Sequence, residues 1–388
     1  MWFQRRQRQD FDEMILETAA DGLQRILDAG GSPETAERAV GEAVQEALAG
    51  STPGVVAQLI RTAPKMLRDR ERLRRRVRRQ VRTHWGKSLN LFMMVVVGAG
   101  EMGTRFDTEH RPPDDEPFDP RYDALLGLHA RACRTALEVY HLLSDGLPKG
   151  ALARVRTLHE IAVTAMVIED YGQQSEHLNL AARFLDHAAV ATYKDALIYQ
   201  LNCETLGYEP FSEEEMADMK ARRDTVVAMY GPAYKEQYGW AAGLDKPTAP
   251  TFRDLERLAR VSHLRGHYSW ASHEVHSDAK GALLNESTWG EIIYRDIGYA
   301  NEGLVDPGHL ALISLHQSTV SLVLSPETPS LRAMVQAQAM SALVEKAGNA
   351  FLAADNAVAA HNAKLQRRGR GSRRWRRFLR LANGFDRD

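Results

Sequence analysis

Apolar residues recur with a helical period along nearly the whole chain, and alternating strand patterns are almost absent. The segment from Phe11 to Ala29 shows this period, and Ser32-Pro33-Glu34 supplies the cap and first turn of a second helix. Glycine and proline at residues 50–53 predict a break. A third helix is predicted from Pro64, with a narrow apolar stripe made of Leu73, Val77, Val81 and Trp85.

Further helices are predicted along the rest of the chain. Ser212 and Glu215 form a capping-box pattern at the start of one of them. The predicted ranges are 121–145, 149–171, 174–204, 212–229, 252–263, 265–284, 306–324 and 329–362. The fold class is therefore all-α: a multi-helix bundle with an N-terminal helical appendage, a basic C-terminal tail and no sheet larger than a hairpin.

Composition shifts divide the chain into five parts. The predicted parts are the appendage (1–52), an arginine-rich helix running into an apolar one (53–103), an acidic, proline-rich linker (104–120), the bundle core (121–363) and the tail (364–388). The apolar run from Leu89 to Ala99 is shorter than the roughly 20 residues of a spanning helix. It is interpreted as a buried core helix, and a short membrane-dipping segment is the alternative.

The N-terminus has arginines but no apolar core of a secretory signal, and the only cysteines are Cys133 and Cys203. They lie far apart in sequence and outside any Cys-x-x-Cys motif. Two reduced thiols and no predicted signal favour a cytoplasmic protein.

Charge is distributed very unevenly. Residues 61–87 hold twelve Lys/Arg against two acids, residues 364–380 hold nine and no acid, and residues 88–363 carry a net charge of −14. Such blocks indicate a polyanionic partner, or docking on the acidic body of the protein itself. Arginine neutralises phosphates, and an interleaved tryptophan can stack on bases. The candidate nucleic-acid-binding residues are Arg74, Arg75, Arg78, Arg82, Arg373, Arg374, Trp375, Arg376 and Arg377.

Two predicted helices carry charges into apolar surroundings. Arg156 and Glu160 are four residues apart and lead into an uninterrupted apolar run, so each needs a partner. They form either a structural ion pair or one wall of a site. On the next helix Arg183, His187 and Lys194 share a stripe, which is either a solvated face or the basic side of a polar pocket.

The segment 263–278 contains four histidines, and on a helix Tyr268, Ser272 and His276 would line one face. Histidine can serve as base, acid or metal ligand near neutral pH. His273 and His276 are spaced for a shared ion, but no HExxH motif or second ligand pair is present, so neither a metal nor another cofactor is predicted. The favoured interpretation is a hydrogen-bonded cluster, catalytic or structural, of Arg156, Glu160, Tyr268, Ser272 and His276.

Other catalytic motifs give no support. GxSxG and P-loop patterns are absent, and no GxGxxG pattern is followed by a predicted helix, so neither a nucleophilic triad nor a nucleotide loop is predicted. An arginine followed four to six residues later by histidine is typical of the helical HEPN ribonucleases. Counted as four to six intervening residues, Arg154 and His159 fit that spacing, but so do Arg79/His84, Arg105/His110, Arg134/His141 and Arg260/His267 in this arginine-rich chain.

Three short motifs in order link the middle of the chain, about residues 120–285, to a known family. They are Arg156-x3-Glu160, Tyr238-Gly239-Trp240-Ala241, and Tyr268-x3-Ser272-x3-His276. This region resembles a bacterial helical family catalogued as a domain of unknown function. The resemblance implies no activity. It does imply that five polar residues come together: Arg156, Glu160, Tyr268, Ser272 and His276. A distant kinship with HEPN-like bundles is a further analogy.

Three functions remain open from the sequence. The first is a nucleic-acid-associated effector in bacterial stress or phage defence, either a ribonuclease-like enzyme or another hydrolase. The second is a non-enzymatic homo-oligomeric scaffold whose arginine-rich helix mediates self-association. The third is a peripheral protein of anionic membrane surfaces, since both basic blocks also contain apolar residues.

Overall fold

The structure is a computed structural model that describes residues 20–22, 24–26, 28–30, 32–113, 119–246, 248–283, 286–289, 292–295 and 298–369. The chain divides into two compact units. One comprises residues 1–76 and 368–388, and the other comprises residues 77–367.

Helix α2 (Pro33–His110) is the longest element, and it includes both prolines that the sequence suggested as boundaries. The break predicted at residues 50–53 and the new start at Pro64 are therefore wrong. Each proline removes one backbone hydrogen bond, but the flanking alanine, leucine, glutamate and arginine residues favour helix strongly. The boundary between the two units falls within this helix, after Arg76.

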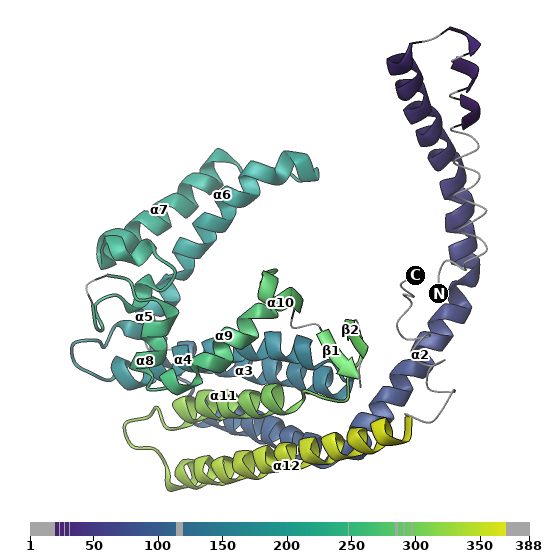
Figure 1. The fold of residues 1–388 in the computed structure, drawn as a ribbon. Coiled ribbons are helices and arrows are strands. Elements are labelled where there is room, and N and C mark those ends of the chain that lie inside the picture. Colours follow the sequence, from purple (N-terminus) through teal and green to yellow (C-terminus); the bar gives the residue numbers. More distant parts are fainter. Residues whose placement is uncertain are drawn as a thin grey trace. The chain divides into compact units, whose positions relative to one another are not determined.

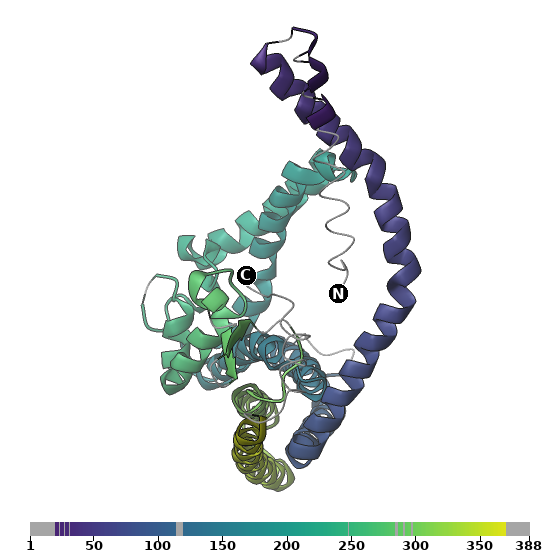
Figure 2. The ribbon, with the colours of Figure 1, turned by 45° about the vertical axis from the view of Figure 1, so that its right-hand side comes forward.

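The core of the second unit is a helical bundle. Helices α3 (Pro120–Ser144), α4 (Pro148–Gly172) and α11 (Val305–Val323) pack against one another, and α12 (Leu331–Gly369) lies beside α11 and the C-terminal half of α2 (Figures 1 and 2). The ring of Phe351 on α12 is fully buried and contacts both Trp85 and Phe92 of α2. The all-α fold class is confirmed.

The predicted stripe on α2 enters this core only from Val77 onward. Val77, Val81 and Trp85 are buried, whereas Leu73 is exposed. The apolar run 89–99 is a core helix segment, as predicted, because one side of it is buried and, of its large apolar residues, only Met94 and Val97 are largely exposed. No helix within the described residues is long and apolar enough to cross a membrane.

The predicted linker is shorter than residues 104–120. Helix α2 continues to His110 because Phe106 is buried and stacks on Tyr122 of α3, while Asp107 accepts a hydrogen bond from the Tyr122 hydroxyl. Residues 114–118 lie outside the described residues. At the other end, α12 extends to Gly369, beyond the predicted start of the tail, and residues 370–388 lie outside the described part.

The helix predicted over 174–204 is in fact two helices, α5 (Leu180–Asp186) and α6 (Ala188–Leu206). They meet at His187, whose Nε2 lies 3.1 Å from the carbonyl oxygen of Tyr234 and 2.9 Å from that of Glu236. Helix α7 (Glu213–Tyr230) follows, and the predicted capping box of Ser212 and Glu215 is present.

The remaining elements are short. The predicted helix 252–263 ends early, and 265–284 is divided in two. The described elements are α8 (Phe252–Leu258), α9 (Arg265–His273), α10 (Ala279–Leu283), the 3-10 turns η1 (Pro232–Lys235), η2 (Gly239–Ala241) and η3 (Ser262–Leu264), and the strands β1 (Glu286–Trp289) and β2 (Ile292–Arg295). The strands form one antiparallel hairpin, with Glu286 opposite Arg295.

Gly308 of α11 provides a test of core packing. A Cβ atom at this position would lie 2.6 Å from carbon atoms of the buried Phe351 ring. We expect Gly308→Ala to lower the free energy of unfolding by about 1–3 kcal/mol, the usual cost of overpacking. The matched control is Gly127→Ala in α3, where a Cβ meets open space. In urea denaturation the control should gain about 0.5–1 kcal/mol from better helix propensity. Equal changes in the two variants would contradict the packing argument.

Candidate functional site

Helix α4 carries the first part of the predicted cluster. The Nε atom of Arg156 donates to Glu160 Oε1 at 3.1 Å, one turn along the same helix, and lies 3.1 Å from the hydroxyl oxygen of Tyr268 on α9. The Tyr268 hydroxyl in turn donates to Glu160 Oε1 at 2.7 Å. The three side chains thus form a closed triangle. The side chains of Arg156 and Glu160 are 20% and 33% exposed, so the triangle lies at the edge of the bundle and not deep inside it.

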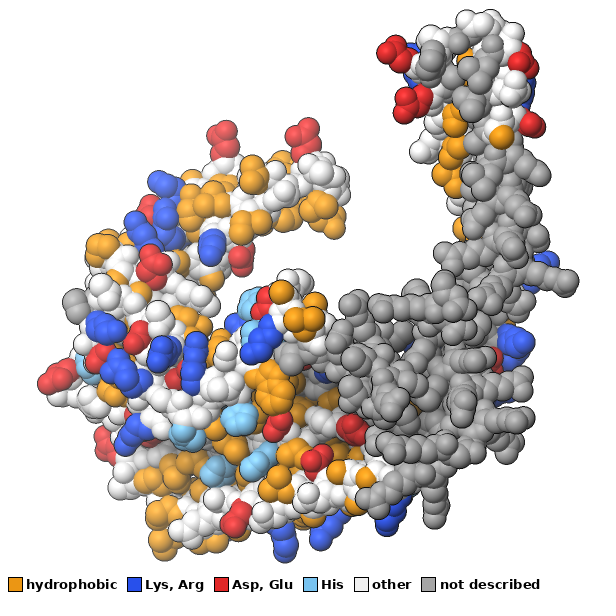
Figure 3. Space-filling model, in the orientation of Figure 1, with side chains coloured by type: hydrophobic (Ala, Val, Ile, Leu, Met, Phe, Trp, Pro, Cys, Tyr) orange, Lys and Arg blue, Asp and Glu red, His pale blue; other side chains and the backbone are white. Residues whose placement is uncertain are grey.

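His276 completes the group on the solvent side. Arg156 Nη1 lies 2.8 Å from His276 Nε2. A guanidinium has only donors, so the Nε2 atom of His276 must accept and cannot carry a proton in this arrangement. Arg156 therefore connects the exposed imidazole to Glu160. Histidine side chains are visible on this face around α9 and α11 in Figure 3.

Ser272 is not part of the group. Its hydroxyl donates to the carbonyl oxygen of Tyr268 one turn earlier at 2.8 Å. The predicted helical face of Tyr268, Ser272 and His276 is also interrupted, because α9 ends at His273. The Asp278 carboxylate accepts from the backbone of Gly281 at the start of α10 and contacts His273 Nδ1 at 2.6 Å. His276 reaches Arg156 from the turn between α9 and α10.

The two tyrosines of the site are held in the neutral form. Burial, followed by the hydrogen bond to Glu160, raises the pKa of Tyr268 well above its usual value. Burial and the charge of Glu160 raise the pKa of Tyr238 to about 12. Tyr268 is therefore a hydrogen-bond donor at neutral pH, and it is not available as a base.

A second polar group, which the sequence did not predict, lies next to the first. Glu256 of α8 is fully buried, and its two carboxylate oxygens contact His159 Nε2 at 3.1 Å and Arg265 Nη1 at 2.9 Å. The guanidinium of Arg265 lies 4.9 Å from the centre of the Tyr268 ring. Burial of an unpaired carboxylate is very costly, so these two partners are required. The signal in the sequence was weak, because it consisted of one glutamate on the buried, mostly apolar face of a short helix.

The space between these groups is small. A crevice lined by Arg156, His159, His267 and Tyr268 has a volume of about 10 Å³. That is room for about one water molecule and for no small-molecule substrate. Within the described residues, no group of three or more His, Cys, Asp or Glu side chains is arranged to share a metal ion. A ligand of this cluster must approach from the open surface, where His276 lies.

Arg154 and His159, which fit the HEPN-like spacing, have separate partners. Arg154 Nε donates to Glu138 of α3 at 2.6 Å, while His159 contacts Glu256 of α8. Five residues on a helix correspond to about 500°, so the two side chains leave α4 in different directions. The spacing alone does not bring them to one site in this chain. The HEPN kinship itself stays a prediction.

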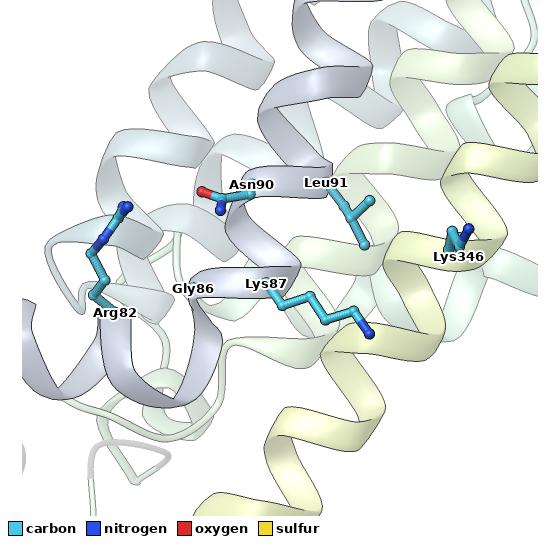
Figure 4. Close-up of a pocket in the computed structure, with 6 residues that line it drawn as sticks. All are labelled: Arg82, Gly86, Lys87, Asn90, Leu91 and Lys346. Atoms are coloured by element: carbon cyan, nitrogen blue, oxygen red, sulfur yellow. The ribbon is translucent and has the colours of Figure 1, made fainter.

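The arginine-rich part of α2 contains an open basic groove within the second unit. It has a volume of about 540 Å³ and is lined by Arg82, Gly86, Lys87, Asn90 and Leu91 of α2 and by Lys346 of α12. Lys87 points toward α12 in Figure 4. No carboxylate lines the groove, and within the described residues none of these three cations has an ion-pair partner. The groove thus presents three exposed positive charges.

The other predicted nucleic-acid-binding residues differ from Arg82. Arg78 Nε pairs with Asp145 at 3.1 Å. In the first unit, Arg74 and Arg75 both pair with Glu71, at 3.7 and 2.8 Å. Residues Arg373, Arg374, Trp375, Arg376 and Arg377 lie outside the described residues. Sequence alone could not separate paired from unpaired arginines, since that depends on acids brought close by the fold.

The buried carboxylate yields a stability test. Glu256→Gln keeps the shape of the side chain but removes the charge that faces His159 and Arg265. We expect the free energy of unfolding to fall by about 1.5–3 kcal/mol, the range for hydrogen bonds to charged groups. The control Glu138→Gln disrupts the exposed pair with Arg154, and exposed pairs contribute about 0–1 kcal/mol. If urea denaturation shows the smaller loss at Glu256, the buried network is not a major source of stability.

Comparison with known proteins finds a family model that matches part of the chain. No curated protein and no solved structure matches the chain. The predicted resemblance of the middle of the chain to a helical family of unknown function is confirmed, and the matched segment contains both Arg156 and His276. Residues 122–290 match the model of a protein family described as a family of unknown function (DUF5677).

Proposed function

We propose that the protein binds nucleic acid through its phosphate backbone, and that the groove of Arg82, Lys87 and Lys346 is one contact surface. The observation that carries the proposal is the absence of carboxylates around these three cations. Some other exposed arginines have acidic partners close by, as Arg78 has in Asp145 and Arg222 has in Asp218. An unpaired cation breaks no ion pair when it contacts a phosphate, and the release of counterions from the nucleic acid favours binding.

The shape of the groove supports the same partner. It is open and broad, and it is formed by the sides of two long helices, α2 and α12. A polymer can lie across such a surface with successive phosphates near successive cations. Lysine and arginine contacts of this kind fix position without reading base sequence. The proposal is therefore for binding with little sequence preference.

A second candidate function is phosphodiester cleavage at the Arg156 cluster. The specific observation is the 2.8 Å contact between Arg156 Nη1 and the unprotonated Nε2 of His276 on the exposed side. A substrate phosphate would take over the Arg156 N–H, because an anion is a better acceptor than a neutral imidazole. His276 Nε2 would then be free to accept a proton from an RNA 2′-OH, whose oxygen bonds to phosphorus while the bond between phosphorus and the 5′-oxygen breaks. The leaving 5′-oxygen would take a proton from water, and a 2′,3′-cyclic phosphate would remain.

The remaining residues of the cluster would serve this chemistry as supports. Glu160 holds the Arg156 guanidinium in place, and Tyr268 fixes Glu160. The guanidinium would stabilise the charge that develops on the phosphorus oxygens. The cluster offers no enclosed cavity, which suits a polymer backbone lying on the surface better than a small substrate.

We place this activity in the cytoplasm as part of the same proposal. Cys133 and Cys203 are both free thiols, as is usual in a reducing compartment. Fractionation of the native host cells tests this placement.

The binding proposal predicts a change in salt dependence. We expect the triple variant Arg82→Gln, Lys87→Gln, Lys346→Gln to bind RNA and DNA duplexes more weakly. The slope of log affinity against log salt should decrease in magnitude by about 2–3, or about 0.9 per lost phosphate contact. Fluorescence anisotropy over a salt series measures both quantities. The control is Arg222→Gln, a paired arginine whose loss should leave the slope unchanged.

Parallel titrations with phosphatidylserine vesicles separate this proposal from the membrane alternative. Binding to vesicles without binding to nucleic acid would contradict the proposal, and so would an unchanged slope in the triple variant. If the wild type binds neither partner but is a stable oligomer that the triple variant dissociates, the scaffold alternative is favoured.

The cleavage proposal predicts a selective loss of activity. We expect His276→Gln to reduce cleavage of a fluorescent RNA by about 10²–10⁴-fold, the usual contribution of a general base or acid. Binding of the same RNA should change little. His263→Gln is the matched control, because His263 is another exposed histidine of the same segment. If the wild type binds the RNA without cleaving it, or if both variants lose activity equally, the cluster is not a nuclease site.

A further inference from the structure

Another pocket lies within the family-matched region, 122–290, and it is lined by different residues from those of the basic groove. Its volume is about 380 Å³, within the range of small-molecule sites. It lies between the C-terminal end of α7, helix α5 and the segment that follows η2. Its lining includes Asn179, Arg183, Met229, Tyr230, Pro232 and Gly243.

Arg183 is the one charged side chain in this lining, and its charge is not neutralised by any described residue. Its Nη2 donates to the carbonyl oxygen of Ala242 at 2.7 Å, and its guanidinium lies 5.7 Å from the centre of the Tyr230 ring. The Nε atom is buried without a hydrogen-bond partner. Burial lowers the pKa of Arg183 from its ordinary value, which is the direction expected for a half-buried cation that lacks a counter-charge.

The acid on the same helix does not serve as that counter-charge. Asp186, one turn further along α5, accepts a hydrogen bond from the Tyr230 hydroxyl at 2.8 Å, and no ion pair joins it to Arg183. Other half-buried arginines of this fold are paired: Arg156 with Glu160 and Arg121 with Glu169. A guanidinium left unpaired beside a cavity is therefore unusual in this bundle, and it indicates a ligand that supplies the missing charge.

The Tyr238-Gly239-Trp240-Ala241 motif leads directly into Ala242 and Gly243, which line the pocket. Gly239 packs so closely on η1 that a Cβ atom would lie 2.5 Å from the carbonyl oxygens of Ala233 and Tyr234. The ring of Trp240 is buried and meets Phe184 of α5 edge to face at 5.3 Å between centroids. These two contacts fix Ala242, the residue that follows the motif. Its carbonyl oxygen accepts the hydrogen bond from Arg183. The motif thus positions the guanidinium at the pocket.

We propose that this pocket binds a small molecule through a carboxylate or phosphate group, with Arg183 as the counter-charge and Tyr230, Met229 and Pro232 as the apolar wall. Arginine suits both oxyanions because its planar N–H groups match their geometry. The amide of Asn179 is a further hydrogen-bonding group in the lining. This site is independent of the nucleic-acid proposal, since it shares no residue with the groove or the Arg156 cluster.

Isothermal titration of the full chain at constant ionic strength tests the proposal. The probes are phenyl phosphate, benzoate and the uncharged benzyl alcohol. We expect saturable binding of at least one anion and none of the alcohol, and the tighter anion identifies the ligand class. Arg183→Gln should weaken that binding about 10- to 100-fold, as expected for loss of a charged hydrogen-bond donor. Arg222→Gln, which removes a paired surface charge on α7, should leave it unchanged.

Met229→Trp provides a variant that does not disturb the Arg183 contacts. Met229 is largely exposed at the pocket rim, so a larger ring should narrow the cavity without changing the core. It should weaken anion binding even if Arg183→Gln does not fold. Failure of both anions to bind the wild type, or equal binding to the wild type and Met229→Trp, would overturn the proposal. RNA binding, measured in parallel, should be unchanged in Met229→Trp, so the two proposals can fail separately.

Discussion

Helix α4 is packed on most of its surface, and this constraint determines where the polar groups of the bundle lie. Helices α3, α11 and the α8–α9 segment all contact it. A polar side chain on α4 must therefore be paired by whichever element covers it. Arg154 meets Glu138 of α3, His159 meets Glu256 of α8, and Arg156 meets Tyr268 of α9. Each pairing joins α4 to a different neighbour and fixes its rotation in the bundle.

This constraint also explains which residues of the polar cluster could be predicted from the sequence and which could not. The charges of Arg156 and Glu160 beside an apolar run required buried partners, and Tyr268 and His276 were the polar residues available. Glu256 was missed because nothing local marks a single glutamate on an amphipathic helix as fully buried. Ser272 was wrongly included because helical spacing was extended past His273, where α9 ends; Asp278 caps the start of the next helix, α10.

The fold class followed from periodicity, but the ends of elements depended on contacts that the sequence does not display. Helix α2 passes through Pro53 and Pro64 because the surrounding residues favour helix, so local breakers did not decide the outcome. The division at His187 depends on carbonyl groups of Tyr234 and Glu236, nearly fifty residues away in sequence. Helix existence was therefore predictable for long segments, while boundaries were decided by tertiary packing.

Pairing with an acid divides the cationic side chains of this protein into two groups. Arg154, Arg78 and Arg121 are cationic side chains with an acid in reach, and their positions are explained by the fold alone. Among the described residues, Arg82, Lys87 and Lys346 are exposed and have no ion-pair partner, and Arg183 is half-buried and has none. For exposed cations the cost of remaining unpaired is small, because water solvates them, and affinity for a polyanion is gained without breaking any contact. For Arg183 the cost is larger, since part of its hydration is lost. A bundle that pairs its other half-buried arginines but leaves this one at a cavity has retained a group whose partner is expected to come from outside the chain.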